Sequence, residues 1–284
     1  MDVRSIATGC KINLFLRVTG CRSDGYHTLE TLFLPLSAPS DMLALDVGAQ
    51  PGIVLRTEGE VPAGPENLVY RAAELYASAS GISPSWAFDL EKHVPVAAGL
   101  GGGSADAAGA LLLLERHFRK LGDEHLRKLA LKLGADVPFF LDPAPALARG
   151  VGEELSRLDE ALPPFHLVLA NPGFPVSAAW AYRHLPERPE SSGTVEGLLA
   201  ALREGDRDGI GRNIRNDLGW ALMRKFPLLT VLRESLTGCG AFAVEVSGSG
   251  PTLFALFPDR AAATQAAAEL SAEYPMFGFF ALEA

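Results

Sequence analysis

The chain has 284 residues, of which 48% are hydrophobic and 21% charged, a composition typical of a folded globular protein and unlike that of a disordered or fibrous one. Its formal net charge of −9 at pH 7 argues against a protein that wraps nucleic acid, because that function needs a basic face that displaces counterions. The three cysteines are an odd set without the spacing of a disulfide framework or a zinc site, so reduced thiols are expected.

No segment predicts export or a membrane span. The first ten residues lack the apolar core of a signal peptide. The most apolar stretch, residues 105–114, is too short to cross a bilayer and contains Asp106. We therefore expect a cytoplasmic protein with no membrane partner. Either a monomer or a weak homodimer is expected, although no sequence pattern selects between them.

The first half of the chain predicts strands grouped with helices. Apolar residues occupy every second position from Ile12 to Val18, which predicts a strand with one buried face and places Lys11 and Asn13 together on the other face. Ser-Asp-Gly at 23–25 predicts a hairpin turn into a second strand over 28–36. The other elements expected in this half are strands near 42–47, 52–56 and 86–91, a helix capped by Asn67 that runs to about 80, a helix from Ser104 to about 118, and a helix over 124–133 that ends at Gly134.

The pattern restarts after about residue 160, which predicts two domains, 1–158 and 159–284. The elements expected in the second half are a strand over 166–170, a turn at 171–173, helices near 177–184, 194–204 and 217–236, a surface loop over 186–193, strands over 241–246 and 253–257, and a helix over 259–272. Because strands and helices do not alternate regularly, the expected fold class is α+β rather than a doubly wound sheet.

A glycine-rich segment carries the first indication of function. Gly-Leu-Gly-Gly-Gly-Ser at 99–104 opens into the predicted helix, so backbone N–H groups without an obstructing Cβ lie at the positive end of a helix dipole. Such a site stabilises an anion, and a triphosphate is the natural occupant. The sequence lacks the Gly-Lys-Ser/Thr of a Walker loop and the third glycine of the dinucleotide fingerprint. A flexible loop with Ser104 as the helix N-cap is the structural alternative.

Five segments together resemble the GHMP kinases, the family of galactokinase, homoserine kinase, mevalonate kinase and phosphomevalonate kinase. The segments are Lys-Ile-Asn-Leu-Phe-Leu at 11–16, Asp-Gly-Tyr-His-Thr-Leu at 24–29, the stretch from Pro95 to Ala108, Gly-Ala-Asp-Val-Pro-Phe at 134–139, and Val-Ser-Gly-Ser-Gly-Pro at 246–251. The resemblance implies a two-domain α+β kinase with its active site in the cleft between the domains. The Gly-Tyr-His and Gly-Ala-Asp-Val-Pro segments resemble a branch whose acceptor alcohol carries a cytidine diphosphate group, in isoprenoid precursor biosynthesis.

The resemblance assigns the catalytic pair. Asp136 is the expected base that accepts the proton of the acceptor hydroxyl, in a corner between Gly134 and an extended Val137 held by the following proline. Lys11 would keep that carboxylate ionised and stabilise the developing alkoxide. Read without the resemblance, Asp136 is a cap or surface charge and Lys11 a solvated strand residue.

The resemblance also assigns the ATP site. Its expected residues are Pro95, Val96, Ala97, Ala98, Gly99, Leu100, Gly101, Gly102, Gly103, Ser104 and Ala105. Asn67 and Lys92 resemble positions near the adenosine, although helix capping explains Asn67 equally well. Mg²⁺ is expected as the ion that neutralises the transferring charge, with the Ser104 hydroxyl as the candidate protein ligand and Asp106 as a residue that could instead stabilise the helix start.

The acceptor is expected to contact Tyr26, His27, Asn13 and Tyr182. By resemblance, Tyr26 offers a ring face to the cytosine and His27 a hydrogen bond to its edge, while Tyr182 is either the second wall of the stack or part of a helix core. Homoserine or mevalonate kinase is the rival within the family, disfavoured by the segment around Tyr26. A non-catalytic nucleotide-binding regulator is the rival from another class, disfavoured because Lys11 and Asp136 are both present.

Overall fold

The computed structural model describes residues 4–48, 50–58, 61–158, 162–185 and 192–284. Its Cα positions group into two compact units, each assembled from separate stretches of the chain. Unit 1 contains the described residues within Met1–Cys10, Ser37–Val94 and Gly101–Pro143, and unit 2 those within Lys11–Leu36, Pro95–Leu100 and Ala144–Ala284. Unit 2 therefore draws on both of the predicted domains, and their boundary at residue 158 stays a prediction.

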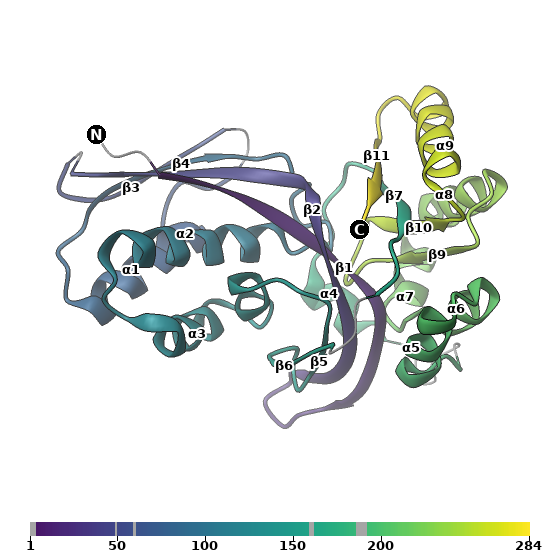
Figure 1. The fold of residues 1–284 in the computed structure, drawn as a ribbon, viewed down its shortest axis with the longest axis horizontal. Coiled ribbons are helices and arrows are strands. Elements are labelled where there is room, and N and C mark those ends of the chain that lie inside the picture. The colour runs from purple at the N-terminus through teal and green to yellow at the C-terminus, as the bar shows by residue number, and fades with distance from the viewer. Residues whose placement is uncertain (1–3, 49, 59–60, 159–161, 186–191) are drawn as a thin grey trace. The chain divides into compact units, whose positions relative to one another are not determined.

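Unit 1 combines a sheet with three helices (Figure 1). The strands are β1 (Arg4–Cys21) and β2 (His27–Val47), which both continue into unit 2, with β3 (Gly52–Thr57) and β4 (Ser85–Glu91). Strand β4 pairs antiparallel with β2 and parallel with β3. The helices are α1 (Leu68–Ser80), α2 (Gly102–Phe118) and α3 (Gly122–Leu133), followed by a short 3₁₀ helix, η1 (Val137–Leu141).

Helix α2 packs closely on strands β1 and β2. A Cβ atom at Gly109 would lie 2.6 Å from Cγ2 of Thr8 and 3.5 Å from Cδ2 of Leu43, so only glycine fits there. Ala105, Ala107 and Ala108 are buried, which brings the first turns of the helix against the sheet. The polar residue Asp106 is carried into the interior with them.

Unit 2 contains a four-stranded antiparallel sheet in the order β11-β7-β10-β9. These strands are β7 (His166–Asn171), β9 (Ala243–Val246), β10 (Leu253–Phe257) and β11 (Gly278–Glu283). Its helices are α4 (Ala178–Arg183), α5 (Val195–Glu204), α6 (Arg207–Asn213), α7 (Gly219–Lys225), α8 (Pro227–Gly238) and α9 (Arg260–Glu273). A hairpin of β5 (Ala146–Arg149) and β6 (Glu154–Arg157) pairs with β2, and the two-residue strand β8 (Arg215–Asn216) pairs in parallel with β1.

Elements with local signals were predicted correctly. Asn67, Ser177, Thr194 and Asp259 each accept a hydrogen bond from a backbone N–H group of the helix that follows, so each is an N-cap. The turn at 23–25 connects β1 to β2 as expected. The loop predicted over 186–193 lies for the most part outside the described residues.

Several predictions were wrong. The helix expected over 217–236 is two helices, α7 and α8, because Pro227 lacks the N–H group that a continuous helix needs. Strand β1 does not have one solvated face: Lys11, Asn13 and Phe15 are 4%, 3% and 0% exposed, as buried as their apolar neighbours. Val137 is not extended but begins the 3₁₀ helix η1. The sequence analysis missed α6, η1, β5, β6, β8 and β11.

Candidate active site

Lys11 lies on β1 in unit 2 with its side chain held by oxygen acceptors. The ammonium group donates to Oδ1 of Asn13 at 2.6 Å and to the carbonyl of Gly99 at 3.3 Å, and it lies 5.2 Å from the ring centre of Phe33. Nδ2 of Asn13 donates in turn to Oγ1 of Thr31 at 2.8 Å, which fixes the orientation of the amide. The predicted grouping of Lys11 with Asn13 is therefore confirmed, and the solvated-strand alternative for Lys11 is wrong.

The glycine-rich loop is contained in the expected ATP-binding segment, residues 95–105. The first part of this segment, 95–100, belongs to unit 2, and several of its backbone carbonyls accept hydrogen bonds from distant segments. The carbonyls of Ala97, Ala98 and Leu100 accept from the backbone N–H groups of Val176, Thr252 and Lys11, respectively. The carbonyl of Gly99 accepts from Oγ of Ser247 at 3.0 Å, as well as from Lys11. A Cβ atom at Gly99, whose φ is +79°, would lie 2.0 Å from the Ser247 carbonyl oxygen, so no other residue fits.

The second part of the loop, 101–105, starts helix α2 in unit 1. Gly101, in the left-handed region with φ of 74°, is the N-cap. Ser104 is the third residue of the helix, so the alternative in which Ser104 caps it is wrong. Gly103 is exposed, and the nearest atom to a Cβ placed there is Cδ1 of Leu68 at 3.9 Å. A helix N-terminus favours an anion, and the exposed Gly103 leaves the start of α2 open to one.

A buried charge network lies behind this helix start in unit 1. Nζ of Lys92 donates to Oδ2 of Asp41 and, at 2.7 Å, to Oδ2 of Asp106. Oγ1 of Thr8 donates to the second oxygen of Asp106 at 2.6 Å. Burial raises the pKa of Asp106 to about 6, against the ammonium of Lys92, which lowers it. The expectation that Asp106 stabilises the helix start is wrong, because the residue lies beyond the first turn and pairs with Lys92.

The structure assigns Lys92 and Asn67 definite local partners. A Cβ at Gly102 would lie 3.5 Å from Nζ of Lys92, which places that ammonium beside the helix start. Asn67 caps α1, since its Oδ1 accepts from the Val69 N–H group at 2.9 Å and its Nδ2 donates to the Pro62 carbonyl at 2.7 Å. The capping interpretation of Asn67 is confirmed, and its contact with adenosine stays a prediction.

Asp136 follows helix α3 in unit 1 and is the N-cap residue of η1. It is half-buried, with helical φ and ψ of −81° and −18°. Gly134 ends α3, but with φ of 169° it is extended rather than left-handed. Because Asp136 belongs to unit 1 and Lys11 to unit 2, their pairing stays a prediction.

The residues expected to hold the cytosine lie in unit 2. The rings of His27 and Tyr182 are stacked, with centroids 5.3 Å apart and planes inclined by 23°. Tyr182 also packs against the apolar core of unit 2, so the two interpretations of this residue are compatible. Tyr26, which precedes His27 in the chain, is 66% exposed and lies in a turn in which its N–H group donates to Asp24.

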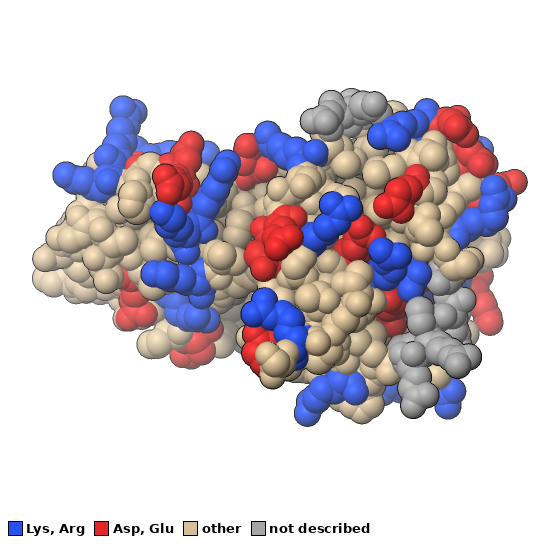
Figure 2. Space-filling model, turned by 90° about the horizontal axis from the view of Figure 1, so that it is seen from below, with Lys and Arg blue, Asp and Glu red and all other residues tan. Residues whose placement is uncertain are grey.

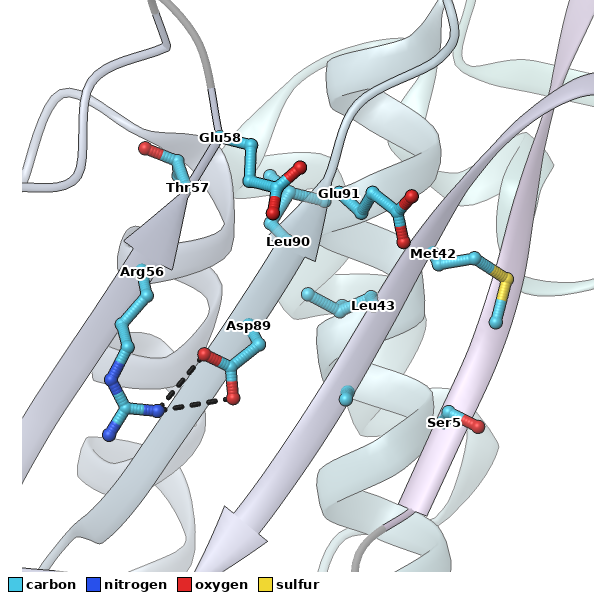
Figure 3. A pocket seen from close by; sticks show the side chains of 10 residues that line it. Ser5, Met42, Leu43, Arg56, Thr57, Glu58, Asp89, Leu90 and Glu91 are labelled. Carbon is cyan, nitrogen blue, oxygen red and sulfur yellow. Dashed lines mark hydrogen bonds and ion pairs between the residues drawn. The ribbon is translucent and has the colours of Figure 1, made fainter.

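One surface pocket in unit 1 is unsuited to a triphosphate. It has a volume of about 410 Å³ on the strands of the sheet (Figure 3). The carboxylates of Glu58, Asp89 and Glu91 line it, and its guanidinium, Arg56, is paired with Asp89 at 3.0 and 3.1 Å. The three carboxylates exceed the single guanidinium, so the lining is negatively charged and repels phosphate. The pocket is therefore not the candidate ATP site. None of the sequence-predicted site residues lines it.

The surface charges and the cysteines agree with what the composition predicts. Lys and Arg side chains lie among Asp and Glu side chains on the face seen in Figure 2. Cys10, Cys21 and Cys239 are thiols rather than disulfides, as expected. Within the described ranges, no helix is long and apolar enough to cross a membrane, and no group of three or more His, Cys, Asp or Glu residues could hold a metal ion.

The sequence analysis missed four residues whose side chains form hydrogen bonds with the candidate residues or with the segment at 246–251: Thr8, Thr31, Asp41 and Asn216. Asp41 offered a signal, since it is a charged residue directly before a predicted strand of apolar residues. The other three are polar residues of common types whose roles depend on partners far away in the sequence.

Comparison with known proteins places the chain in a family of kinases. The profile of the GHMP kinases N terminal domain matches residues 67–142, and that of the GHMP kinases C terminal domain matches residues 198–275. The chain belongs to the GHMP kinase family, and the predictions of an α+β fold and of a small-molecule kinase are confirmed.

Similar proteins give a finer indication. A protein of Nitratidesulfovibrio vulgaris (strain DP4) named 4-diphosphocytidyl-2-C-methyl-D-erythritol kinase is 41% identical over 262 residues, which cover 91% of this chain and 92% of the relative. A crystal structure of 4-(cytidine 5'-diphospho)-2C-methyl-D-erythritol kinase has a TM-score of 0.83 at 38% identity and covers 99% of this chain and 98% of the other. Homoserine kinase from Cytophaga hutchinsonii, with a TM-score of 0.79 at 20% identity over 100% of this chain and 95% of its own, shares the fold.

Proposed function

We propose that this protein transfers the γ-phosphoryl group of ATP to the 2-hydroxyl group of 4-diphosphocytidyl-2-C-methyl-D-erythritol, in the methylerythritol phosphate pathway of isoprenoid precursor biosynthesis. The observation that carries the proposal is the contact between Lys11 and the glycine-rich loop. In a GHMP kinase, an ammonium 3.3 Å from the Gly99 carbonyl stands beside the segment expected to bind the phosphates. The names of the relatives supply the identity of the acceptor.

The proposed donor site uses the start of helix α2. The triphosphate of ATP would bind the backbone N–H groups that follow Gly101, where the helix dipole favours negative charge. The four carbonyls of residues 97–100 are occupied by protein donors, which reduces the repulsion they would otherwise exert on an anion. Lys92 lies beside Gly102 and would contribute a polar contact near the adenosine, while its charge is balanced by Asp41 and Asp106.

The proposed catalytic groups are Asp136 and Lys11. Phosphoryl transfer needs little covalent participation by the protein, so these groups act by positioning and by charge. Asp136 would accept the proton of the acceptor hydroxyl as the bond to phosphorus forms. Lys11 would stabilise the developing alkoxide, and its hydrogen bond to Asn13 keeps its ammonium from swinging away.

The proposed acceptor site uses Tyr26, His27 and Tyr182. Aromatic faces stack on a nucleobase whatever its identity, so the hydrogen-bonding groups of His27 would carry the preference for cytosine. The stack of His27 on Tyr182 would hold the imidazole in one plane, which supports that role. Asn13 would add a polar contact near the reacting hydroxyl.

The described residues fit Mg²⁺ held mainly by phosphate. Mg²⁺ keeps several waters and takes one or two protein oxygens together with substrate phosphates, and the described chain has no dense cluster of acidic ligands. Ser104, half-buried in the first turn of α2, would supply the protein oxygen. When bound, the ion would neutralise charge on the transferring phosphoryl group. A cytoplasmic location and a monomeric or weakly dimeric state remain part of the proposal.

An acceptor panel tests the proposal. ATP consumption should be observed with 4-diphosphocytidyl-2-C-methyl-D-erythritol, with little or none for homoserine, mevalonate or methylerythritol 4-phosphate. Turnover with homoserine or mevalonate and none with the cytidyl compound would move the protein to another branch of the family. ATP binding without turnover of any acceptor would favour a non-catalytic nucleotide-binding protein.

A further inference from the structure

Asn216 is a buried residue of unit 2. Its side-chain amide forms hydrogen bonds with the loop at 246–250 and with the backbone of Leu218, two residues further along the chain. Asn216 is 7% exposed. Its Nδ2 donates to the carbonyl of Val246 at 2.8 Å and to the carbonyl of Gly248 at 2.7 Å, and its Oδ1 accepts from the Leu218 N–H group at 2.9 Å. Both amide hydrogens and one lone pair of the carbonyl oxygen are therefore used. Three hydrogen bonds to backbone groups fix the position of those groups, beyond what packing of the side chain would do.

The loop that Asn216 holds lies beside the candidate catalytic lysine and the residues that bind it. A Cβ atom on Gly248 would lie 3.0 Å from Oδ1 of Asn13, 3.2 Å from the Gly99 carbonyl oxygen and 3.4 Å from Nζ of Lys11. Gly248 has φ of +53°, so the loop makes this approach in a conformation that suits glycine. The Oγ atom of its neighbour Ser247 accepts from the Asn13 N–H group at 3.3 Å and donates to the Gly99 carbonyl at 3.0 Å.

The strand that carries Asn216 is itself fixed to the strand that carries Lys11. In the parallel pairing of β8 with β1, Asn216 lies opposite Leu16. The next residue, Asp217, accepts from the Val18 N–H group at 2.9 Å and from the Arg215 guanidinium at 2.6 and 3.2 Å. Two consecutive side chains therefore connect β1 to the loop at 246–250.

We propose that Asn216 is a positioning residue for phosphoryl transfer, acting by clamping the loop at 246–250 and thereby the ammonium of Lys11 and the carbonyl of Gly99. This inference rests on the proposed function. Without the two amide donors, the carbonyls of Val246 and Gly248 lose these partners and the loop can move away from Lys11. Because Lys11 is proposed to act on charge that develops during transfer, its misplacement should lower kcat more than it raises KM.

Two variants separate the amide donors from the volume of the side chain. Asn216→Asp keeps the shape but places oxygen against two carbonyl oxygens, and Asn216→Ala removes the group. Both should lower kcat by about 10- to 100-fold, with KM for ATP and for the cytidyl substrate each within about 3-fold of the unaltered protein. Asn213→Ala is the matched control, because Asn213 is a nearby half-buried asparagine whose side chain bonds to Gly209 and Thr194 instead of this loop, and it should keep kcat within about 2-fold.

Hydrogen–deuterium exchange supplies a readout that does not depend on activity. Amides of 246–250 should exchange faster in both Asn216 variants and not in the Asn213 variant. Unchanged exchange in this loop, a kcat of the aspartate variant within about 2-fold of the unaltered protein at pH 8, or a KM increase as large as the loss of kcat would each overturn the inference. If the unaltered protein phosphorylates no cytidyl substrate, the proposed function fails, while the exchange comparison still decides whether Asn216 holds the loop.

Discussion

Replacing Asp106 by asparagine should remove a loss of stability that the unaltered protein suffers as the pH rises. Two buried carboxylates, Asp41 and Asp106, share the ammonium of Lys92, and burial raises the pKa of Asp106 from 3.8 to about 6. A raised carboxyl pKa means that the folded state binds the proton more tightly than the unfolded state. Its contribution to stability is therefore full below the unfolded pKa and is lost as the pH rises through about 6.

The size of the effect follows from the shift. One pKa unit corresponds to about 1.4 kcal/mol, and the unfolded carboxyl group is already partly ionised at pH 4, so the titration should cost the folded protein about 2 kcal/mol between pH 4 and pH 7. The amide introduced by Asp106→Asn carries no charge at any pH. Its carbonyl oxygen can still accept from Lys92, which leaves that ammonium paired with a single carboxylate, Asp41.

Urea unfolding at pH 4, 5, 6 and 7 measures this difference. The free energy of unfolding of Asp106→Asn relative to the unaltered protein should rise by about 2 kcal/mol across this range. Asp89→Asn is the control, because the ion pair of Asp89 with Arg56 is more than half exposed and should add little. A difference between the unaltered protein and Asp106→Asn that stays constant with pH would refute the reasoning, since the carboxyl group would then titrate alike in both states.

Three further predictions concern the proposed activity. Asp136→Asn should keep ATP binding in calorimetry and lower kcat by about 100-fold or more, and near-normal turnover would rule out Asp136 as the base. Gly103→Val adds a side chain at an exposed position of the α2 start that has room for it, so ATP affinity should fall by at least about 10-fold while the fold is kept. The control Gly238→Val, at the exposed end of α8, should leave ATP affinity unchanged. Equal affinities of the two variants would mean that the phosphates bind elsewhere. Tyr26→Ala and His27→Ala should raise KM for the cytidyl substrate with little change in ATP affinity. For Tyr26→Ala the loss of binding free energy should be near the roughly 1–3 kcal/mol typical of one base stack. A KM that neither substitution changes would exclude this cytosine site.

The parts of the fold that the sequence predicted are those set by neighbouring residues. The helix cap Asn67 accepts from the N–H group of Val69, two residues away, so the local sequence contains the whole signal. Strand β8 has two residues and no periodicity of its own, and it exists because it pairs with Phe15 and Leu16 of a distant segment. The break at Pro227 is different, because the proline was visible and its effect on the helix predicted over 217–236 was overlooked.

The candidate site divides in the same way. Alternation along β1 correctly grouped Lys11 with Asn13, since side chains two residues apart share a face. Burial of that face was not predictable from β1 alone, because it depends on what the rest of unit 2 packs against it. The ion pairs of Lys92 with Asp41 and Asp106, and the hydrogen bonds of Asn216, join segments far apart in the chain, and no local pattern marks such partners.

The composition of unit 2 also sets an order of events during synthesis on the ribosome. All residues of unit 1 have been made once Pro143 is reached, whereas unit 2 needs segments from Lys11 to the final strand. Lys11 and Gly99 are translated early, whereas Ser247, which donates to the Gly99 carbonyl, follows Gly99 by 148 residues. A nascent chain can therefore assemble the helix start that would receive the phosphates before the loop at 246–250 is made, so catalytic competence should follow the synthesis of that loop.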